Sequence, residues 1–272
     1  MSLPVTIVIP TLNEAEQIAD CVRQVSWADE TIVADASSTD GTVALARQAG
    51  AVVLEGTGPT IAAQRNAAIA LARNAWIFAL DADERLTPDL REELALTLSD
   101  PRYRAYRVRR RNFYLGGELR RGHWGRDWVT RLFSRECRWQ ERRVHETLEF
   151  EGESGMLRGT LLHSPYRSLA HQLEKMNRYA LWGAQDLYDR GRRASAWDIG
   201  VRPLGRFVRA YLLQGAIFDG RFGLVASTLG AYTGFLKYAH LWALEQRRVQ
   251  EGAVATSSSL PEPPPAAAAP HE

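Results

Sequence analysis

Cysteine and lysine are scarce in this sequence, and long apolar runs are missing. Its 272 residues include two cysteines, Cys21 and Cys137, which are too few and too far apart to indicate a disulfide framework or a zinc site. This usage fits a reducing compartment. Lys175 and Lys237 are the only lysines, so nearly all of the 34 basic residues are arginines. In the C-terminal third, 15 uncharged residues lie between Arg221 and Lys237, fewer than the roughly 20 that cross a bilayer. We therefore expect no membrane-spanning helix.

Two common nucleotide-binding signatures are also missing. No G-x-G-x-x-G follows the first predicted strand, and no G-x-x-x-x-G-K-[ST] occurs anywhere in the chain. These absences disfavour a dinucleotide-dependent dehydrogenase and a P-loop enzyme. A secretory leader is not recognisable either, because residues 1–4 lead directly into an apolar β-branched run. We expect a cytoplasmic protein.

The charges are distributed unevenly along the chain. The hydrophobic content of 45% and the charged content of 24% are ordinary for a folded protein with a sizeable core. The net charge of +2 hides the contrast between residues 1–101, with 6 arginines and 15 acids, and residues 102–143, with 14 arginines and 4 acids. The first stretch is suited to holding cations and the second to meeting anions.

Apolar strand patterns and helical patterns alternate in the first 100 residues. Short apolar runs end in polar loops, and amphipathic stretches with helical spacing separate them. This alternation predicts an α/β fold with a mostly parallel sheet flanked by helices, in which ligands bind at the carboxyl ends of the strands. The predicted strands are 5–9, 31–34, 51–54 and 76–80, and the predicted helices are 16–25 and 60–73.

An acidic cluster follows the fourth predicted strand, in W-I-F-A-L-D-A-D-E-R from Trp76 to Arg85. In extended chain Asp81 and Asp83 would point the same way and meet one cation, while Glu84 would point elsewhere. Hard oxygen ligands of this kind suit Mg²⁺ or Mn²⁺, which in turn hold phosphate oxygens. The alternative is an acidic loop before a helix that begins at Thr87 and Pro88, where acids favour the helix N-terminus.

Four motifs in this order resemble the nucleotide-sugar-binding half of a family 2 glycosyltransferase with the GT-A fold. They are V-T-I-V-I-P-T-L-N-E, D-A-S-S-T-D-G-T, A-Q-R-N and L-D-A-D-E. The resemblance implies that Asp35 contacts the uracil or ribose of a UDP-sugar, that Asp81 faces the nucleoside and that Asp83 ligates the metal. Many members carry a second Asp where this chain has Ala36, which weakens the choice of UDP. The residues implied to bind the nucleotide sugar are Pro10, Thr11, Glu14, Asp35, Arg65, Asp81 and Asp83.

A basic extended stretch from Tyr103 to Tyr114 alternates aromatic residues and arginines. Such a pattern can stack on single-stranded nucleic acid. We favour a sugar acceptor over nucleic acid, because this family places its acceptor site here and arginines serve equally well for phosphates on a lipid or oligosaccharide. The two tryptophans that follow are also compatible with simple packing under a loop. The candidate acceptor-binding residues are His123, Trp124, Asp127, Trp128 and Arg131.

The candidate general base is Glu146. An inverting transfer needs a carboxylate that removes the proton of the attacking hydroxyl. The E-D pair that supplies it in many family members does not occur after the acidic cluster, but V-H-E at 144–146 resembles the subgroup of lipopolysaccharide inner-core β-glucosyltransferases. Glu141 and Asp127 are the fallback choices, and a surface glutamate is the structural alternative. The resemblance also implies that His163 is a metal ligand, although a histidine at a strand end is often only hydrogen-bonded.

The C-terminal third is predicted to be helical and rich in aromatic residues and arginines. Helices are expected over 168–190, 204–218 and 222–244, in an appendage of residues 166–250 after a glycosyltransferase domain of residues 1–165. This composition suits peripheral attachment to the inner face of the cytoplasmic membrane. Packing on the sheet domain or on a second subunit is the alternative. Residues 251–272, which are rich in Pro, Ala and Ser, are expected to be disordered.

These features predict an inverting, Mg²⁺- or Mn²⁺-dependent hexosyltransferase. The expected donor is UDP-glucose, and the expected acceptor is a sugar hydroxyl of a lipid-linked saccharide such as the lipopolysaccharide core. A polyprenyl phosphate acceptor and a non-catalytic nucleotide-sugar-binding protein remain as alternatives. A processive synthase is disfavoured because no Q-x-x-R-W follows the candidate base.

Overall fold

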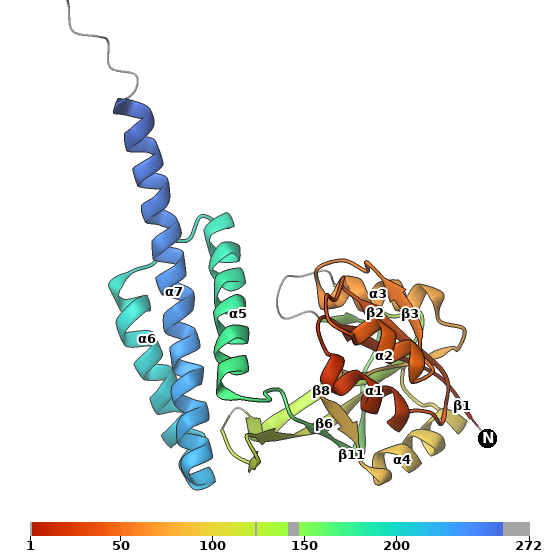
Figure 1. Ribbon diagram of the computed structural model, residues 1–272. Helices are drawn as coiled ribbons and strands as arrows, with labels where there is room; N and C mark the ends of the chain where they lie inside the picture. The colour runs from red at the N-terminus through yellow and green to blue at the C-terminus, as the bar shows by residue number, and fades with distance from the viewer. Residues whose placement is uncertain (1, 123, 141–146, 258–272) are drawn as a thin grey trace, which may run out of the picture.

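The computed structural model describes residues 2–122, 124–140 and 147–257, which form a sheet domain followed by a group of helices (Figure 1). The first four strands are parallel to one another in the order β3-β2-β1-β4. The alternation of strands and helices predicted from the sequence is thereby confirmed. The strands are β1 (Leu3–Thr11), β2 (Ala28–Asp35), β3 (Val52–Glu55) and β4 (Trp76–Ala79), and the helices are α1 (Ala15–Gln24), α2 (Thr42–Gln48) and α3 (Ile61–Leu71).

The second half of the sheet is mixed. β8 (Asp127–Ser134) is antiparallel to β4, and β6 (Ala105–Tyr114) is antiparallel to β8. β11 (Gly155–His163) is parallel to β6, and the short β5 (Glu84–Leu86) is antiparallel to β11. The result is a mostly parallel, helix-flanked sheet with an antiparallel insertion, as expected for the GT-A fold. The remaining elements here are α4 (Pro88–Ser99), β7 (Gly117–Leu119), the 3₁₀ turn η1 (Trp124–Arg126) and the small pair β9 (Arg138–Trp139) and β10 (Leu148–Glu149).

The central strand β1 is buried on both faces, which explains its continuous apolar sequence. Ile7 and Ile9 belong to a core cluster that includes residues of α1 and α4. Val8 points to the opposite face and belongs to a second cluster with α3. Helices on both sides thus hold the sheet, and the carboxyl ends of its strands remain for a site.

The C-terminal helices form a separate group beside the sheet, with α5 between α7 and the sheet domain (Figure 1). Two expectations are corrected here. The helix predicted over 204–218 is broken, because Gly215 adopts a left-handed backbone conformation with φ of 78°. The tail predicted to be disordered from 251 is helical as far as Ser257, since α7 continues that far. The elements are α5 (Leu169–Asp189), α6 (Ala196–Val208), the π-helical η2 (Arg209–Leu213), the 3₁₀ turn η3 (Ala216–Asp219) and α7 (Gly220–Ser257).

An aromatic cluster joins these helices to the sheet domain. Tyr114 at the end of β6 packs with Trp124, Tyr166 and Phe222, and its hydroxyl donates a hydrogen bond of 2.6 Å to Gln172 of α5. None of the helices in the described ranges is long and apolar enough to cross a membrane. The contacts of Tyr114 fix the start of α5 close to the carboxyl ends of the strands.

Candidate active site

The acidic cluster lies in a turn and not in an extended strand. β4 ends at Ala79, and the Glu84 N–H donates to the Asp81 carbonyl oxygen over 3.0 Å, so the chain reverses before β5. The expected reason for Asp81 and Asp83 to point the same way is therefore wrong. The turn instead sends the two carboxylates into different surroundings.

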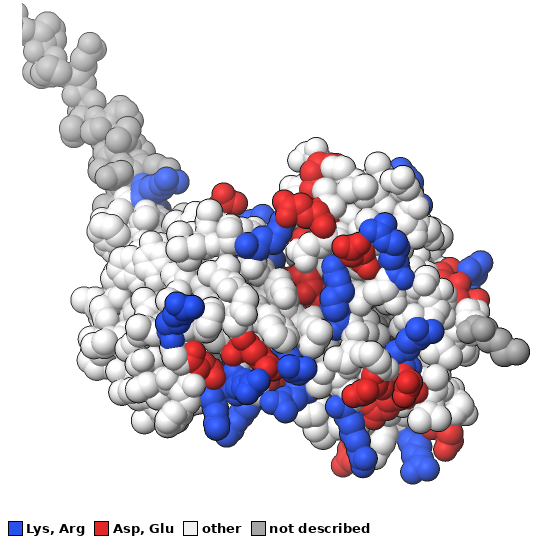
Figure 2. Space-filling view, turned by 60° about the horizontal axis from the view of Figure 1, so that its bottom comes forward, with Lys and Arg blue, Asp and Glu red and all other residues white. Residues whose placement is uncertain are grey.

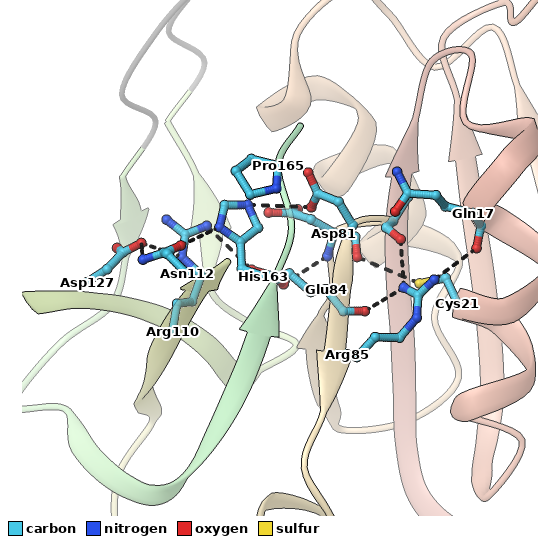
Figure 3. A network of polar contacts seen from close by, with 12 residues as sticks. Gln17, Cys21, Asp81, Glu84, Arg85, Arg110, Asn112, Asp127, His163 and Pro165 are labelled. Carbon is cyan, nitrogen blue, oxygen red and sulfur yellow. Dashed lines mark hydrogen bonds and ion pairs between the residues drawn. The ribbon is translucent and has the colours of Figure 1, made fainter. Parts of the chain in front are cut away.

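Asp81 belongs to a buried cluster of carboxylates and arginines (Figure 3). Its Oδ1 accepts a hydrogen bond of 2.7 Å from Arg65, and its Oδ2 accepts one from Arg131. Glu84, which is 0% exposed, accepts a hydrogen bond of 2.6 Å from Arg131, and its other oxygen accepts the Asp81 N–H over 3.1 Å. Arg110 approaches Glu84 to 3.4 Å. Burial by itself would raise the pKa of Asp81, but Arg131 and Arg65 more than offset it and hold this pKa far below its ordinary value.

Arg131 does not occupy the acceptor-binding position predicted from the sequence. It is 3% exposed and lies beneath the strand ends, where it joins Asp81 to Glu84. Arg65 is equally buried, and its guanidinium lies 4.5 Å from the ring centroid of Trp139. Both arginines hold the acidic turn in place through their ion pairs with Asp81 and, for Arg131, with Glu84. Because both carboxylate oxygens of Asp81 accept hydrogen bonds from these arginines, Asp81 is better suited to orienting the turn than to ligating a metal.

Asp83, in contrast, faces a histidine and a lysine. Its Oδ1 is buried and has no hydrogen-bond partner among the residues that the structure describes, and the Nε2 of His163 lies 3.7 Å away. Its Oδ2 lies 3.9 Å from the Nζ of Lys175. Pairing of β5 with β11 brings His163 opposite Glu84, and the Ser164 N–H donates to the Asp83 carbonyl oxygen over 3.0 Å. Burial raises the pKa of Asp83, but His163 and Lys175 outweigh it and lower the pKa below its ordinary value.

Asn112 fixes which nitrogen of His163 faces Asp83 (Figure 3). The amide nitrogen of Asn112 donates to the Trp124 carbonyl oxygen over 2.7 Å and to Asp127 over 3.2 Å. Its oxygen therefore points at the Nδ1 of His163, 2.6 Å away, and must accept the Nδ1 proton. In the neutral imidazole this leaves the lone pair on Nε2, the nitrogen nearest Asp83. A hydrogen bond of this kind to the other ring nitrogen is characteristic of histidines that ligate metals.

The donor set fits a divalent ion. No group of three His, Cys, Asp or Glu side chains suited to a metal occurs among the described residues. Two potential ligands nevertheless lie side by side. One is Asp83 Oδ1, a buried oxygen without a hydrogen bond, and the other is His163 Nε2, which carries a lone pair in the neutral imidazole. Mg²⁺ and Mn²⁺ sites with few protein ligands take the others from phosphate oxygens and water. Asp83 and His163 are therefore the residues that would hold the ion.

The nucleotide-binding residues expected on β1 and β2 lie together, but Asp35 is enclosed. It is 1% exposed and accepts hydrogen bonds from the Thr11 hydroxyl over 3.1 Å and from both the N–H and the hydroxyl of Ser38, over 2.8 and 2.5 Å. In this conformation Asp35 shapes the loop and presents no surface to a base or ribose, contrary to expectation. Pro10 is buried beside Thr11, and Glu14 lies at the loop that follows. Burial raises the pKa of Glu14.

The expected acceptor residues are only partly placed by the structure. Asp127 is paired with Arg110 over 2.8 Å and is therefore an unfavourable fallback base. Trp124 packs in the aromatic cluster, which matches the packing alternative, and Trp128 is half-buried on β8. The remaining candidates, His123, Glu141 and Glu146, lie outside the described residues.

Sequence reasoning missed four residues of the site, namely Glu84, Arg110, Asn112 and Lys175. A signal existed for two of them. Side chains alternate along β6, so Arg110 and Asn112 share the buried face with the apolar Val108, whereas Arg107 and Arg109 point to the exposed face. The basic stretch was therefore a two-sided strand with two polar residues turned inward. Nothing in the local sequence indicated Lys175, because it reaches the site from α5.

Comparisons with known proteins identify the family of the chain. The sequence model of Glycosyl transferase family 2 matches residues 6–159. The lipopolysaccharide core biosynthesis glycosyltransferase LpsC of Rhizobium meliloti is 30% identical over 249 residues, which are 88% of this chain and 92% of LpsC. An uncharacterized glycosyltransferase of Rickettsia prowazekii is 28% identical over 247 residues, 86% of this chain and 85% of the relative.

Solved structures match over a smaller part. Glucosyl-3-phosphoglycerate synthase from Mycobacterium tuberculosis, in complex with Mn²⁺, UDP and glucosyl-3-phosphoglycerate, is 25% identical with a TM-score of 0.32, and the match spans 42% of this chain and 44% of that one. The chain therefore covers less than half of that structure's length. The family match, by comparison, includes more than half of the present chain, and the match to LpsC extends over nearly all of both proteins. The protein belongs to glycosyl transferase family 2.

Proposed function

We propose that the protein transfers a hexose, with glucose from UDP-glucose as the first candidate, to a sugar hydroxyl of a lipid-linked acceptor such as the lipopolysaccharide core. The observation that carries the donor half is the pair formed by Asp83 and His163 at the strand ends, 3.7 Å apart. The choice of UDP rests on the four sequence motifs. The acceptor class is supported by the similarity to LpsC over nearly its whole length.

Each of these residues has a separate role in the proposed single displacement at the anomeric carbon. Asp83 and His163 would hold a divalent ion, which supplies positive charge against the diphosphate of the donor. Arg65 and Arg131 keep Asp81 and the turn in place, so that Asp83 does not have to reorganise when the donor binds. The acceptor oxygen bonds to the anomeric carbon while the bond from that carbon to the diphosphate oxygen breaks and leaves its electron pair on the diphosphate. In this proposal the hydroxyl proton passes to Glu146. The anomeric configuration is inverted because the acceptor oxygen attacks in a single step from the side opposite the diphosphate.

Donor binding is tested with Asp83→Asn. Thermal stabilisation by UDP-glucose and Mn²⁺ should be present in the wild type, because a ligand that binds only the folded state raises its stability, and should be lost in the variant. Asp20→Asn is the matched control, since Asp20 is an exposed aspartate paired with Arg23 on α1. Equal stabilisation of Asp83→Asn and wild type would contradict the assigned metal ligand.

The transfer step is tested with Glu146→Gln. Release of UDP from UDP-glucose in the presence of Mn²⁺ and a bacterial lipid extract should stop in this variant, while UDP-glucose binding persists. Retained turnover on a polyprenyl phosphate would favour that alternative, because such an acceptor has no hydroxyl to deprotonate. Binding without any turnover in the wild type would favour a non-catalytic nucleotide-sugar-binding protein.

We also propose that the C-terminal helices attach the enzyme to the anionic inner face of the cytoplasmic membrane. α6 is rich in apolar residues, yet Asp198 is its only buried residue, and no residue of η2 is buried. Phe218 and Leu213 are 81% and 79% exposed. In Figure 2 a broad uncharged area covers much of the helical part, with basic side chains gathered beside it. An exposed apolar surface bordered by arginines fits the interface of an anionic bilayer. The arginines of this region are Arg202, Arg206, Arg209 and Arg221.

Sedimentation with vesicles that contain phosphatidylglycerol tests the attachment. The wild type should pellet at low salt, and the double variant Leu213→Ser/Phe218→Ser should remain in solution. Leu96→Ser is the control, because Leu96 is an exposed leucine on α4, in the sheet domain. A wild type that stays in solution and elutes as a dimer would instead indicate that this surface packs on a second subunit.

A further inference from the structure

Lys175 brings a positive charge from the C-terminal helices to the edge of the acidic turn. Its Nζ lies 3.9 Å from Asp83 Oδ2 and 3.4 Å from the carbonyl oxygen of Pro165, and its side chain is 17% exposed. The ammonium group has three N–H donors, and of these the described residues engage one, with Pro165. Lys175 is thus largely buried at the site and retains hydrogen-bonding capacity.

The position of Lys175 is set by contacts of residues that precede it in the chain. Gln172, one helical turn earlier on the same face of α5, accepts the buried hydrogen bond from Tyr114 of β6. Arg167, just before α5, lies 3.0 Å from Glu16 and 4.0 Å from Glu14. These contacts hold the first turns of α5 against the loop after β1 and against the end of β6. Lys175 is therefore positioned by the fold and does not simply reach in from solvent.

The other cations near the acidic turn already have partners. Arg85 donates to the backbone carbonyl oxygens of Ala82, Glu84 and Gln17. The three carboxylates Asp81, Glu84 and Asp127 face the three guanidinium groups of Arg65, Arg131 and Arg110. Arg167 faces Glu14 and Glu16, on the side of the β1 loop. Lys175 is therefore the cation that the structure leaves beside Asp83, within the described residues. A donor diphosphate adds at least two negative charges at this edge, where Asp83 and a divalent ion together supply only one positive charge.

We propose that Lys175 is a donor-site residue that binds a phosphate oxygen of the sugar nucleotide's diphosphate. The inference rests on the proposed function, because it takes the ligand at Asp83 to be a metal-bound diphosphate. Lysine is well suited to phosphate as a compact point charge. Lys175 needs only to turn from Asp83 toward the adjoining phosphate, and it then stabilises the charge that the diphosphate gains as its bond to the sugar breaks. The helical appendage thereby contributes to the donor site.

Calorimetric binding of inorganic pyrophosphate and of UDP, each with Mn²⁺, tests this role in the full chain. Lys175→Gln should weaken both by roughly ten- to a hundredfold, the range expected for one lost charge-assisted hydrogen bond. Lys175→Arg should restore part of the affinity, since it restores the charge. Lys237→Gln, at the only other lysine, should bind as the wild type does, because Lys237 lies on α7 over the ring of Tyr238.

Mn²⁺ binding without phosphate, followed by electron paramagnetic resonance, separates this role from a purely structural one. Removal of Lys175 should leave Mn²⁺ affinity unchanged or raise it, because a competing cation at Asp83 is gone. A Lys175→Gln variant that binds pyrophosphate as tightly as the wild type overturns the inference, and so does one whose unliganded melting temperature falls together with its affinity for Mn²⁺. A wild type that binds pyrophosphate but not UDP contradicts the proposed donor. The pyrophosphate affinities of the wild type and Lys175→Gln then still test the role of Lys175. A wild type that binds neither overturns both.

Discussion

Arg131→Met should strongly destabilise the protein, because it removes the shared donor of the buried acidic turn. Arg131 donates to Asp81 and, over 2.6 Å, to Glu84, which is fully buried. After the substitution Asp81 keeps Arg65, but Glu84 keeps only the Asp81 N–H at 3.1 Å and Arg110 at 3.4 Å. Two charge-assisted hydrogen bonds, each contributing about 1.5–3 kcal/mol, disappear. The expected loss in unfolding free energy is about 3–5 kcal/mol, as for other buried ion pairs that lose one partner.

Urea unfolding followed by tryptophan fluorescence measures this loss, and a thermal scan should show a decrease in melting temperature of roughly 6–20 °C. Arg104→Met is the matched control, because Arg104 makes an exposed ion pair of 3.0 Å with Glu136. Its loss should stay below about 1 kcal/mol. A double variant with Glu84→Gln should lose less than the sum of the two single variants, since both remove the same contact. If Arg131→Met costs no more than Arg104→Met, the buried cluster does not stabilise the fold as argued.

Three further changes have defined outcomes. Gly159→Ala should lower the unfolding free energy by about 1–3 kcal/mol in denaturant titrations, because its Cβ would lie 2.4 Å from the α4 backbone, whereas Gly200→Ala meets no atom within 4 Å and should be neutral or stabilising. Tyr114→Phe leaves the buried Gln172 oxygen without its donor and should cost about 1–3 kcal/mol; an unchanged denaturation midpoint would show that this contact does not hold α5. Burial raises the pKa of Glu14 above 4.5, so the folded state disfavours its charged form and loses stability as pH rises through the folded pKa. Glu14→Gln should therefore stabilise the unliganded protein at about pH 7.5 and have little effect near pH 4, and a gain that is independent of pH would contradict this reasoning.

The sequence by itself determined the first half of the fold. The strands β1 to β4 are short, apolar and rich in β-branched residues, and each ends in a polar loop, so local pattern alone located them. Because the carboxyl ends of parallel strands share one edge, the order of the motifs also predicted the edge of the sheet at which the candidate site lies. The helix caps of α4 and α5, Thr87 and Ser168, are likewise local signals.

Only the tertiary structure decided what each candidate site residue contacts. Asp81 and Asp83 are two residues apart, yet a turn places one between buried arginines and the other beside His163. Asn112 selects the free nitrogen of that histidine through hydrogen bonds that depend on how β6, β8 and β11 pair. Lys175 arrives from a helix about 90 residues further along the chain, where no local pattern distinguishes it from a surface lysine. Composition and periodicity report which residues are buried and in which element, whereas the register of strands and the docking of helices determine which charges meet.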